Sequence, residues 1–189
     1  MYFERTDEEI INSYKEGNVD DFHFLIKRYT PPLFNFSMRF VGKDNATDIT
    51  QEVFIKVWKK IDNFDFKKSS FKTWIFTIAK NTALDFLRKN KKTTTFTELE
   101  PIDKKDSFSD KIEDENILPD EALQKIQDKE FLNDLLENLS LEHKTVLTLH
   151  YQEEMTFDEI GKILNKPLNT VKSYHHRACL LYTSPSPRD

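Results

Sequence analysis

Residues 156–177 read TFDEIGKILNKPLNTVKSYHHR and carry the strongest local pattern in the chain. Thr156 and Glu159 have the spacing of a capping box, which is typical of a helix N-terminus. Asn165 tolerates the left-handed backbone conformation, and Pro167 suits the first turn of a new helix. The stretch therefore predicts two helices joined by a tight turn. This is the helix-turn-helix pattern, which ordinary αα-hairpins also share.

The second of these helices is expected to turn Leu168 and Val171 inward and to leave a polar, basic outer face. Early residues of a recognition helix reach base edges in the major groove of DNA. The candidates for such contacts are Asn169, Thr170, Lys172, Ser173 and His176.

An amphipathic helix is predicted over residues 48–61, where Ile49, Val53, Val57 and Ile61 recur at four-residue steps. Asp44 or Thr47 is expected to cap it, because both side chains accept hydrogen bonds from exposed backbone N–H groups.

A second helix is predicted over residues 71–89, apolar on most of its circumference. Its remaining strip holds Trp74, Asn81 and Arg88 at seven-residue spacing, which suits base stacking together with phosphate contacts. Phe71 is expected in the core, whereas Trp74 is expected to stay partly exposed. The preceding basic, aromatic loop, residues 64–71, has the composition to hold an unpaired base.

The charge is unevenly distributed along the chain, which has a formal net charge of −5. Residues 53–97 hold 11 Lys and Arg against 3 Asp and Glu, and residues 98–134 hold 5 against 13. The first block, at +8, favours a polyanionic partner, although a solvated lysine-rich helix face would look the same. The second block, at −8, suggests an acidic linker that imitates nucleic acid.

The chain is predicted to be all-α, with two helical domains at residues 1–92 and 132–178 and a flexible acidic linker at 93–131. Three glycines exclude phosphate-binding glycine loops, and one cysteine excludes a disulfide scaffold. No signal peptide and no apolar run of membrane-spanning length is present. We expect a cytoplasmic protein without membrane insertion.

Together these segments resemble a bacterial RNA polymerase sigma factor of the extracytoplasmic-function (ECF) type. Residues 48–58 (DITQEVFIKVW) resemble the segment that grips the polymerase clamp helices. Residues 71–88 (FKTWIFTIAKNTALDFLR) resemble the segment that melts and reads the −10 promoter element. Residues 139–147 (LSLEHKTVL) and 155–178 resemble the domain that reads the −35 element.

The resemblance implies a protein without catalytic activity, metal or cofactor, whose partners are core RNA polymerase, promoter DNA and an anti-sigma factor. The implied polymerase-binding residues are Asp48, Gln51, Glu52, Phe54 and Trp58. The implied −10 residues are Phe66, Lys67, Lys68, Lys72, Trp74, Thr77, Lys80, Asn81, Asp85, Arg88 and Lys89. The implied −35 residues are Asn169, Thr170, Lys172, Ser173, His176 and Arg177.

Two features depart from the family pattern. Tyr174 and His175 stand where the family usually has a basic and then an aliphatic residue. Residues 179–189 (CLLYTSPSPRD) contain two prolines that cannot extend the last helix, and they resemble the translation of a transposase-based sequencing adapter. We expect this tail to be non-native.

Three other functions fit parts of the sequence. A helix-turn-helix regulator that acts without core polymerase would explain residues 156–177 but leave residues 48–58 without a role. A metalloenzyme would need His143, His150, His175 and His176 as ligands, and their spacing matches no known metal motif. The acidic bias also permits a helical module that only binds other proteins.

Overall fold

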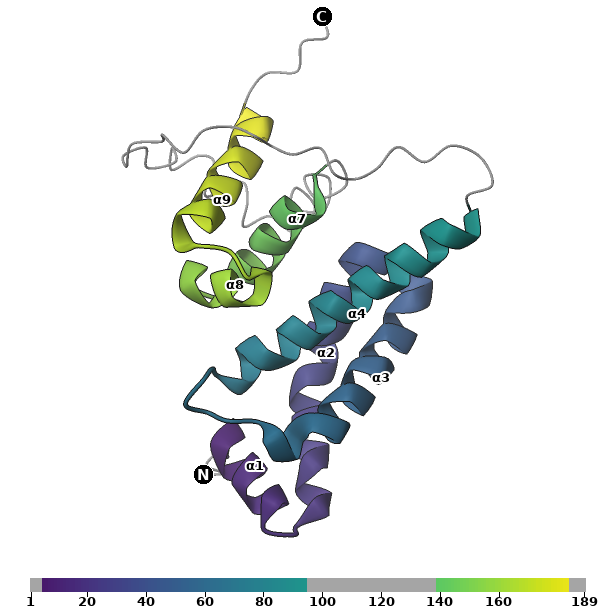
Figure 1. The fold of residues 1–189 in the computed structure, drawn as a ribbon, viewed down its shortest axis with the longest axis vertical. Helices are drawn as coiled ribbons and strands as arrows, with labels where there is room; N and C mark the ends of the chain where they lie inside the picture. The colour runs from purple at the N-terminus through teal and green to yellow at the C-terminus, as the bar shows by residue number, and fades with distance from the viewer. Residues whose placement is uncertain (1–4, 95–138, 184–189) are drawn as a thin grey trace, which may run out of the picture.

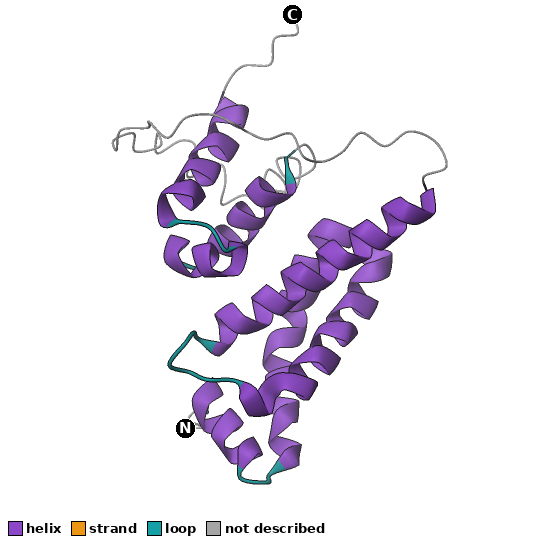
Figure 2. Ribbon diagram, viewed as in Figure 1, coloured by secondary structure: helices purple, strands orange, loops and turns teal. Residues whose placement is uncertain are grey.

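The computed structural model describes residues 5–94 and 139–183. These residues form two groups of helices (Figure 1), and none of them lies in a β-strand (Figure 2). The all-α prediction is confirmed for this part of the chain. Residues 93 and 94, the first two of the proposed acidic linker, are the end of a helix; the rest of the linker and the prolines of the tail lie outside the described residues.

The first group contains four α-helices and two short 3₁₀ turns. They are α1 (Asp7–Lys15), η1 (Val19–Asp21), α2 (Phe22–Val41), α3 (Lys43–Lys60), η2 (Ile61–Asn63) and α4 (Phe71–Thr94). Helices α2, α3 and α4 pack against one another around an aromatic core. Phe36 and Phe76 are fully buried there, with ring centroids 5.4 Å apart in an edge-to-face arrangement. The apolar stripe of α3, with Val53 and Val57 fully buried, faces this core as predicted.

Helix α3 begins earlier than the sequence suggested. It starts at Lys43 directly after Gly42, whose φ of +78° ends α2, and no side chain caps it. The prediction of a cap at Asp44 or Thr47 is therefore wrong. The chain can turn sharply at Gly42 because glycine adopts positive φ at little cost, and Ala46 is then buried in the second turn of the new helix.

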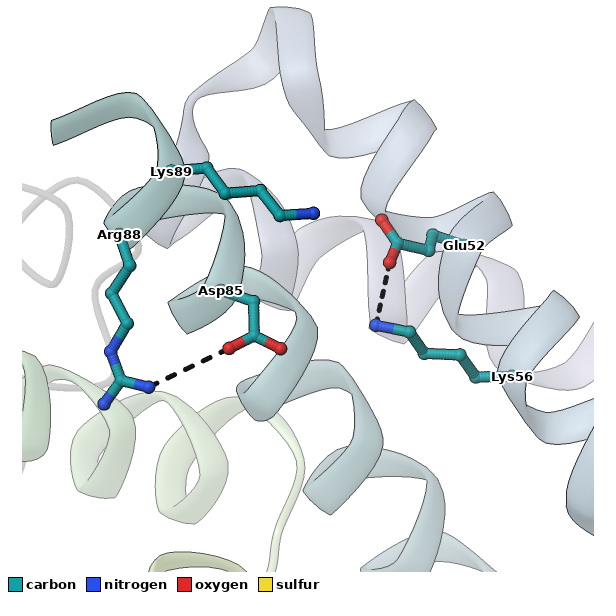
Figure 3. Close-up of a pocket in the computed structure, with 5 residues that line it drawn as sticks. All are labelled: Glu52, Lys56, Asp85, Arg88 and Lys89. Carbon is teal, nitrogen blue, oxygen red and sulfur yellow. Dashed lines mark ion pairs between the residues drawn. The ribbon is translucent and has the colours of Figure 1, made fainter. Parts of the chain in front are cut away.

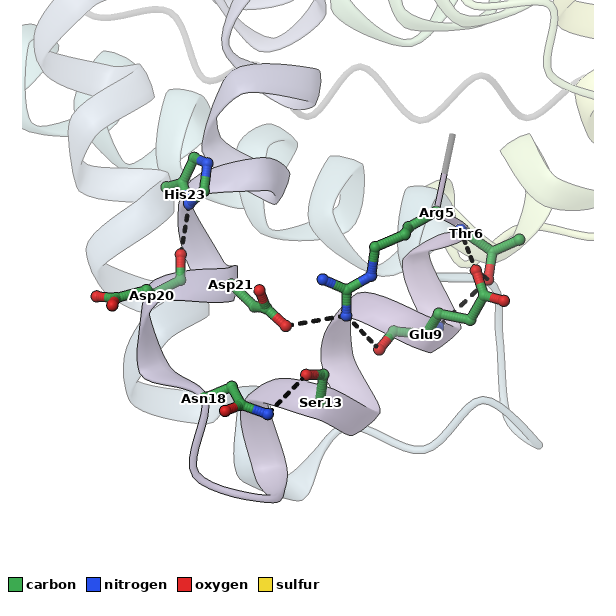
Figure 4. A network of polar contacts seen from close by, with 8 residues as sticks. All are labelled: Arg5, Thr6, Glu9, Ser13, Asn18, Asp20, Asp21 and His23. Atoms are coloured by element: carbon green, nitrogen blue, oxygen red, sulfur yellow. Dashed lines mark hydrogen bonds and ion pairs between the residues drawn. The ribbon is translucent and has the colours of Figure 1, made fainter. Parts of the chain in front are cut away.

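A polar network fastens α1 to the start of α2 (Figure 4). Thr6 and Glu9 form a capping box at the N-terminus of α1. Arg5 makes an ion pair of 2.9 Å with Asp21 on the other side of the turn, and the Tyr29 hydroxyl donates to Asp7. These contacts hold α1 against the start of α2.

The second group is a compact helix-turn-helix unit. Its elements are α7 (Leu141–Leu147), a π-helical turn η3 (Thr148–Gln152), α8 (Phe157–Leu164) and α9 (Leu168–Thr183). The predicted capping box of Thr156 and Glu159 is present, and Asn165 ends α8 in the left-handed conformation, with φ 54° and ψ 48°. Helix α9 runs five residues past Ala178, the expected end of the domain.

The inward face of α9 differs from the prediction at one residue. Val171 is fully buried, but Leu168 is 42% exposed, so the expectation that Leu168 faces inward is wrong. Leu168 is the first residue of α9, and the first turn of a helix at the edge of a small domain has few neighbours to cover it.

Candidate nucleic-acid interface

Helix α4 presents a polar and aromatic strip beside its buried face. Phe71 is 1% exposed and belongs to the core, as predicted. Trp74 is partly buried, with its ring centroid 4.8 Å from that of Phe64 and 5.7 Å from that of Phe71. Three turns along the helix from Phe71, Asn81 is exposed, and so is Arg88 two turns further on. The strip therefore begins on an anchored indole and ends in polar and cationic side chains.

The loop before α4 is shaped by local hydrogen bonds. The Lys67 N–H donates to the Asp65 carboxylate at 2.9 Å, and the Thr73 N–H donates to the Ser70 hydroxyl at 3.2 Å, which caps α4. Lys67 and Lys68 are exposed, whereas Phe66 packs edge-on against Phe64 at 4.7 Å. The cations of this loop point into solvent from a backbone that is already ordered.

Two cations of α4 do not point into solvent but contact the second group of helices, hereafter the second domain. The Lys72 ammonium donates to the backbone carbonyl of Glu153, and the Lys80 ammonium donates to the carbonyl of Ile163 at 2.9 Å. Partial burial lowers the pKa of Lys80. Among the other predicted residues of this strip, Thr77 is partly buried, and Asp85 and Lys89 are exposed.

A shallow pocket of about 210 Å³ lies between α3 and α4 (Figure 3). It is lined by Glu52, Lys56, Asp85, Arg88 and Lys89. Lys56 pairs with Glu52 at 2.8 Å, and the more exposed Arg88 lies 3.8 Å from Asp85. The pocket thus joins residues predicted for polymerase binding with residues predicted for DNA binding.

The outer face of α3 combines carboxylates with large apolar side chains. Asp48, Gln51 and Glu52 are exposed, and Phe54 is partly buried against the core. Trp58 is 56% exposed and Ile55 is 52% exposed. Ile55 was not predicted from the sequence; the signal for it is its place off the Ile49–Val53–Val57 stripe, three residues before Trp58. Two large exposed apolar side chains one turn apart are typical of a protein-binding face.

Helix α9 carries the predicted groove-facing residues on its outer side. Asn169 and Lys172 are exposed, and Thr170, Ser173, His176 and Arg177 are partly buried. The turn before α9 is tight: the Lys166 N–H donates to the Gly161 carbonyl at 3.0 Å, and a Cβ on Gly161 would lie 2.9 Å from the Lys166 carbonyl oxygen. This close approach sets the angle at which α9 leaves α8.

His175 lies on the inner side of α9, where it is 9% exposed. Its Nε2 atom is 2.9 Å from the Tyr151 hydroxyl, and its ring lies 5.0 Å from that of Phe157. Burial, assisted by His150 and His176, lowers the pKa of His175 from 6.5 to about 4. His175 therefore serves as a neutral core residue, which explains how it takes the place of an aliphatic side chain.

His150 also has structural contacts. The ring of His150 stacks on Phe157 at 4.4 Å, and its Nδ1 atom donates to the Met155 carbonyl at 2.9 Å. Within residues 5–94 and 139–183, no three His, Cys, Asp or Glu side chains come together as a metal site would require. In the same residues, no helix has both the length and the apolar character to span a bilayer.

Each of the two groups of helices matches a known protein-family model. Residues 25–93 match the model of sigma-70 region 2, and residues 132–180 match the model of sigma-70 region 4. The chain is 31% identical over 169 residues to the ECF RNA polymerase sigma factor SigW of Bacillus subtilis, which covers 88% of this chain and 89% of SigW. It is 29% identical over 178 residues to the ECF RNA polymerase sigma-E factor of Haemophilus influenzae, which covers 92% and 91% of the two chains.

Two solved structures share the fold. CnrH in complex with the cytosolic domain of CnrY is 20% identical with a TM-score of 0.61, over 89% of each chain. RpoE in complex with the anti-sigma factor NepR from Bartonella quintana is 23% identical with a TM-score of 0.60, over 87% of this chain and 99% of RpoE.

Proposed function

The chain belongs to the ECF family of RNA polymerase sigma factors, and from this premise we propose which of its surfaces carry out each step of initiation. It directs core RNA polymerase to promoters and has no catalytic role of its own. The observation that carries the assignment is the presence, in one chain, of a protein-binding face on α3 beside separate polar faces on α4 and α9.

We propose that core polymerase binds the outer face of α3. The residues are Asp48, Gln51, Glu52, Phe54 and Trp58, to which Ile55 is added. The exposure of Ile55 and Trp58 supports this role, because large apolar side chains surrounded by charge commonly supply most of the binding energy of an interface.

The −10 element is proposed to bind the α4 strip and the loop before it. Trp74 offers a stacking surface held by Phe64 and Phe71, and Asn81 offers hydrogen bonds to a splayed base. Lys67, Lys68, Arg88 and Lys89 supply phosphate contacts. Stacking contributes about 1–3 kcal/mol per base, which is comparable to the cost of unstacking.

The −35 duplex is proposed to bind the outer side of α9 through the six residues predicted above. The helix-turn-helix geometry supports this assignment, since the N-terminal part of α9 protrudes with Asn169 and Lys172 exposed. Buried His175 supports it as well, because the departure from the family pattern at that position lies away from the DNA-reading side.

The proposal includes a cytoplasmic location, where polymerase and DNA are found, and regulation by an anti-sigma factor, a partner present in the RpoE structure.

Residues 179–189 are proposed to be a non-native tail. The Ser-Pro-Ser-Pro run at residues 184–187 and the resemblance of the segment to a translated adapter support this reading. Sequencing the gene from an independently prepared library tests it: a different sequence after codon 178 is expected, and the same tail would refute the proposal.

In vitro transcription with core polymerase on a genomic promoter library tests the function. We expect co-elution with core polymerase and specific transcripts that depend on the added chain. Trp74→Ala and Asn81→Ala should impair open-complex formation more than polymerase binding. Tight, specific promoter binding by the chain alone, with no transcripts on adding core polymerase, would instead favour a regulator that acts without polymerase.

A further inference from the structure

A lysine of α1 is bonded to the loop that precedes α4. Lys15 lies in the last turn of α1, and its ammonium donates to the backbone carbonyl of Phe64 at 2.8 Å, across 49 positions of sequence. The Phe64 N–H in turn donates to the Ile61 carbonyl at 3.0 Å, which closes the 3₁₀ turn η2. Both backbone polar groups of Phe64 are therefore bonded, and the chain is held at the point where the loop begins.

The side chain of Phe64 lies at the centre of the aromatic cluster that holds Trp74. Phe64 is 6% exposed. Its ring centroid lies 4.7 Å from that of Phe66, 4.8 Å from that of Trp74 and 5.6 Å from that of Phe71. Phe64 thus contacts each of the other three rings. Any displacement of its backbone would shift the indole that is proposed to stack on a base.

The opposite end of α1 supports the same cluster through α2. Asp7, in the first turn of α1, accepts from the Tyr29 hydroxyl at 2.5 Å. The Tyr29 ring is 5% exposed and packs edge-to-face on Phe71, with centroids 5.3 Å apart. Asp7 and Lys15 stand at the two ends of α1, about 12 Å apart along its axis. Helix α1 therefore braces the aromatic cluster at two separate points.

Of these two contacts, the bond of Lys15 is the better suited to positioning rather than to stability. Lys15 is exposed, so its hydrogen bond contributes little to folding, because water can replace either partner. The bond still selects one position of the loop, and binding groups lose much of their effect when their support is loose by about 1 Å. Asp7, in contrast, also pairs with Arg28, so its replacement would disturb the fold as well.

We infer that Lys15 is a positioning residue for the −10 surface: it fixes Phe64 and, through Phe64, the orientation of the Trp74 ring. The inference rests on the proposed function of α4 and of the loop before it. Lys15 acts through the ring that receives the base. Its loss is therefore expected to reduce the affinity gained from a captured base and to leave the number of phosphate contacts unchanged.

The fluorescence of Trp74 in the DNA-free chain tests the support itself. The chain has two tryptophans, so Trp58→Phe leaves Trp74 as the single emitter. In this background we expect Lys15→Met, which keeps a long side chain without a donor, to increase acrylamide quenching of Trp74 about twofold. The control is Lys27→Met, which removes the same charge from an exposed position on α2 and should leave the quenching unchanged. Equal quenching in the two variants would overturn the inference.

Binding of single-stranded DNA tests the consequence for base capture. The probe is the oligonucleotide that the wild-type chain selects from a random single-stranded pool, compared with the same strand carrying an abasic site at each position in turn. We expect the most harmful abasic site to weaken binding about tenfold in wild type and in Lys27→Met, but only about threefold in Lys15→Met. A loss of folded protein would lower both affinities equally and leave this penalty unchanged, so the penalty reports on positioning.

Salt dependence distinguishes positioning from a direct phosphate contact. Loss of one contact to a single strand lowers the slope of log K against log salt by about 0.7, whereas we expect Lys15→Met to keep the wild-type slope. A lower slope with an unchanged abasic penalty would refute the inference and make Lys15 a phosphate contact.

The outcomes also separate the role of Lys15 from the function on which it rests. A reduced abasic penalty in Lys15→Met, in a chain that directs no transcript with core polymerase, would refute the proposed function and leave the positioning role established. Transcription that depends on the chain, together with an unchanged abasic penalty in Lys15→Met, would refute the positioning role alone.

Discussion

Acidification should destabilise the second domain through His175. The unfolded chain binds a proton at this imidazole near pH 6.5, whereas the folded chain keeps it neutral down to about pH 4 because the side chain is buried. Stability is therefore fully present above pH 6.5 and falls as the pH drops towards 4. At about 1.4 kcal/mol for each tenfold change in proton affinity, the total loss is about 3 kcal/mol, of which about 2 kcal/mol is lost by pH 5.

The assay is urea denaturation at pH 7.5 and pH 5, followed by NMR signals of second-domain amides such as that of Val171. Two variants isolate the effect of His175. His175→Gln keeps a neutral polar group beside Tyr151 but cannot take up the proton, so it should lose about 2 kcal/mol less than wild type on acidification. His176→Gln, on the more exposed side of α9, should lose as much as wild type.

A direct titration of the imidazole completes this test. Nitrogen chemical shifts of the His175 ring should show no protonation until well below pH 5.5 in the folded chain. Titration of His175 near pH 6.5, or equal losses of stability by wild type and His175→Gln between pH 7.5 and pH 5, would contradict a neutral, buried His175.

Three further predictions concern single contacts. Gly161→Ala should destabilise the second domain by about 1–3 kcal/mol, because the new Cβ would lie 2.9 Å from the Lys166 carbonyl oxygen; an unchanged thermal midpoint would show that the turn can relax. Thr156→Ala should cost about 1 kcal/mol in urea denaturation, since it removes a capping box, and a loss near zero would contradict that role. Ile55→Ala and Trp58→Ala should weaken binding to core polymerase at least tenfold in a fluorescence titration without lowering the urea midpoint, because both side chains are exposed; unchanged affinity would place the polymerase face elsewhere.

Local features of this fold follow well from the sequence. The capping box at Thr156, the left-handed Asn165 and the buried Phe71 depend on residue type and on neighbours a few positions away. The same local reasoning failed at the start of α3, because Gly42 ended α2 and began the next helix without any capping side chain.

Features that depend on distant parts of the chain were not predictable in this way. The hydrogen bond between Lys80 and Ile163 joins residues 83 positions apart, and no periodic pattern in the sequence predicts it. Leu168 looks like a core residue by type and spacing, and its exposure depends on how few side chains surround the start of α9. His175 looks like a surface residue by type, and only the packing of Tyr151 and Phe157 around it shows the opposite.

The two proposed DNA-binding faces of the chain are unequally accessible. Asn169 and Lys172 at the start of α9 are exposed, whereas Lys72 and Lys80 of α4 already donate to the backbone carbonyls of Glu153 and Ile163. On the proposed assignment, duplex DNA meets exposed side chains on α9, whereas a single strand on α4 competes with two lysine–carbonyl bonds.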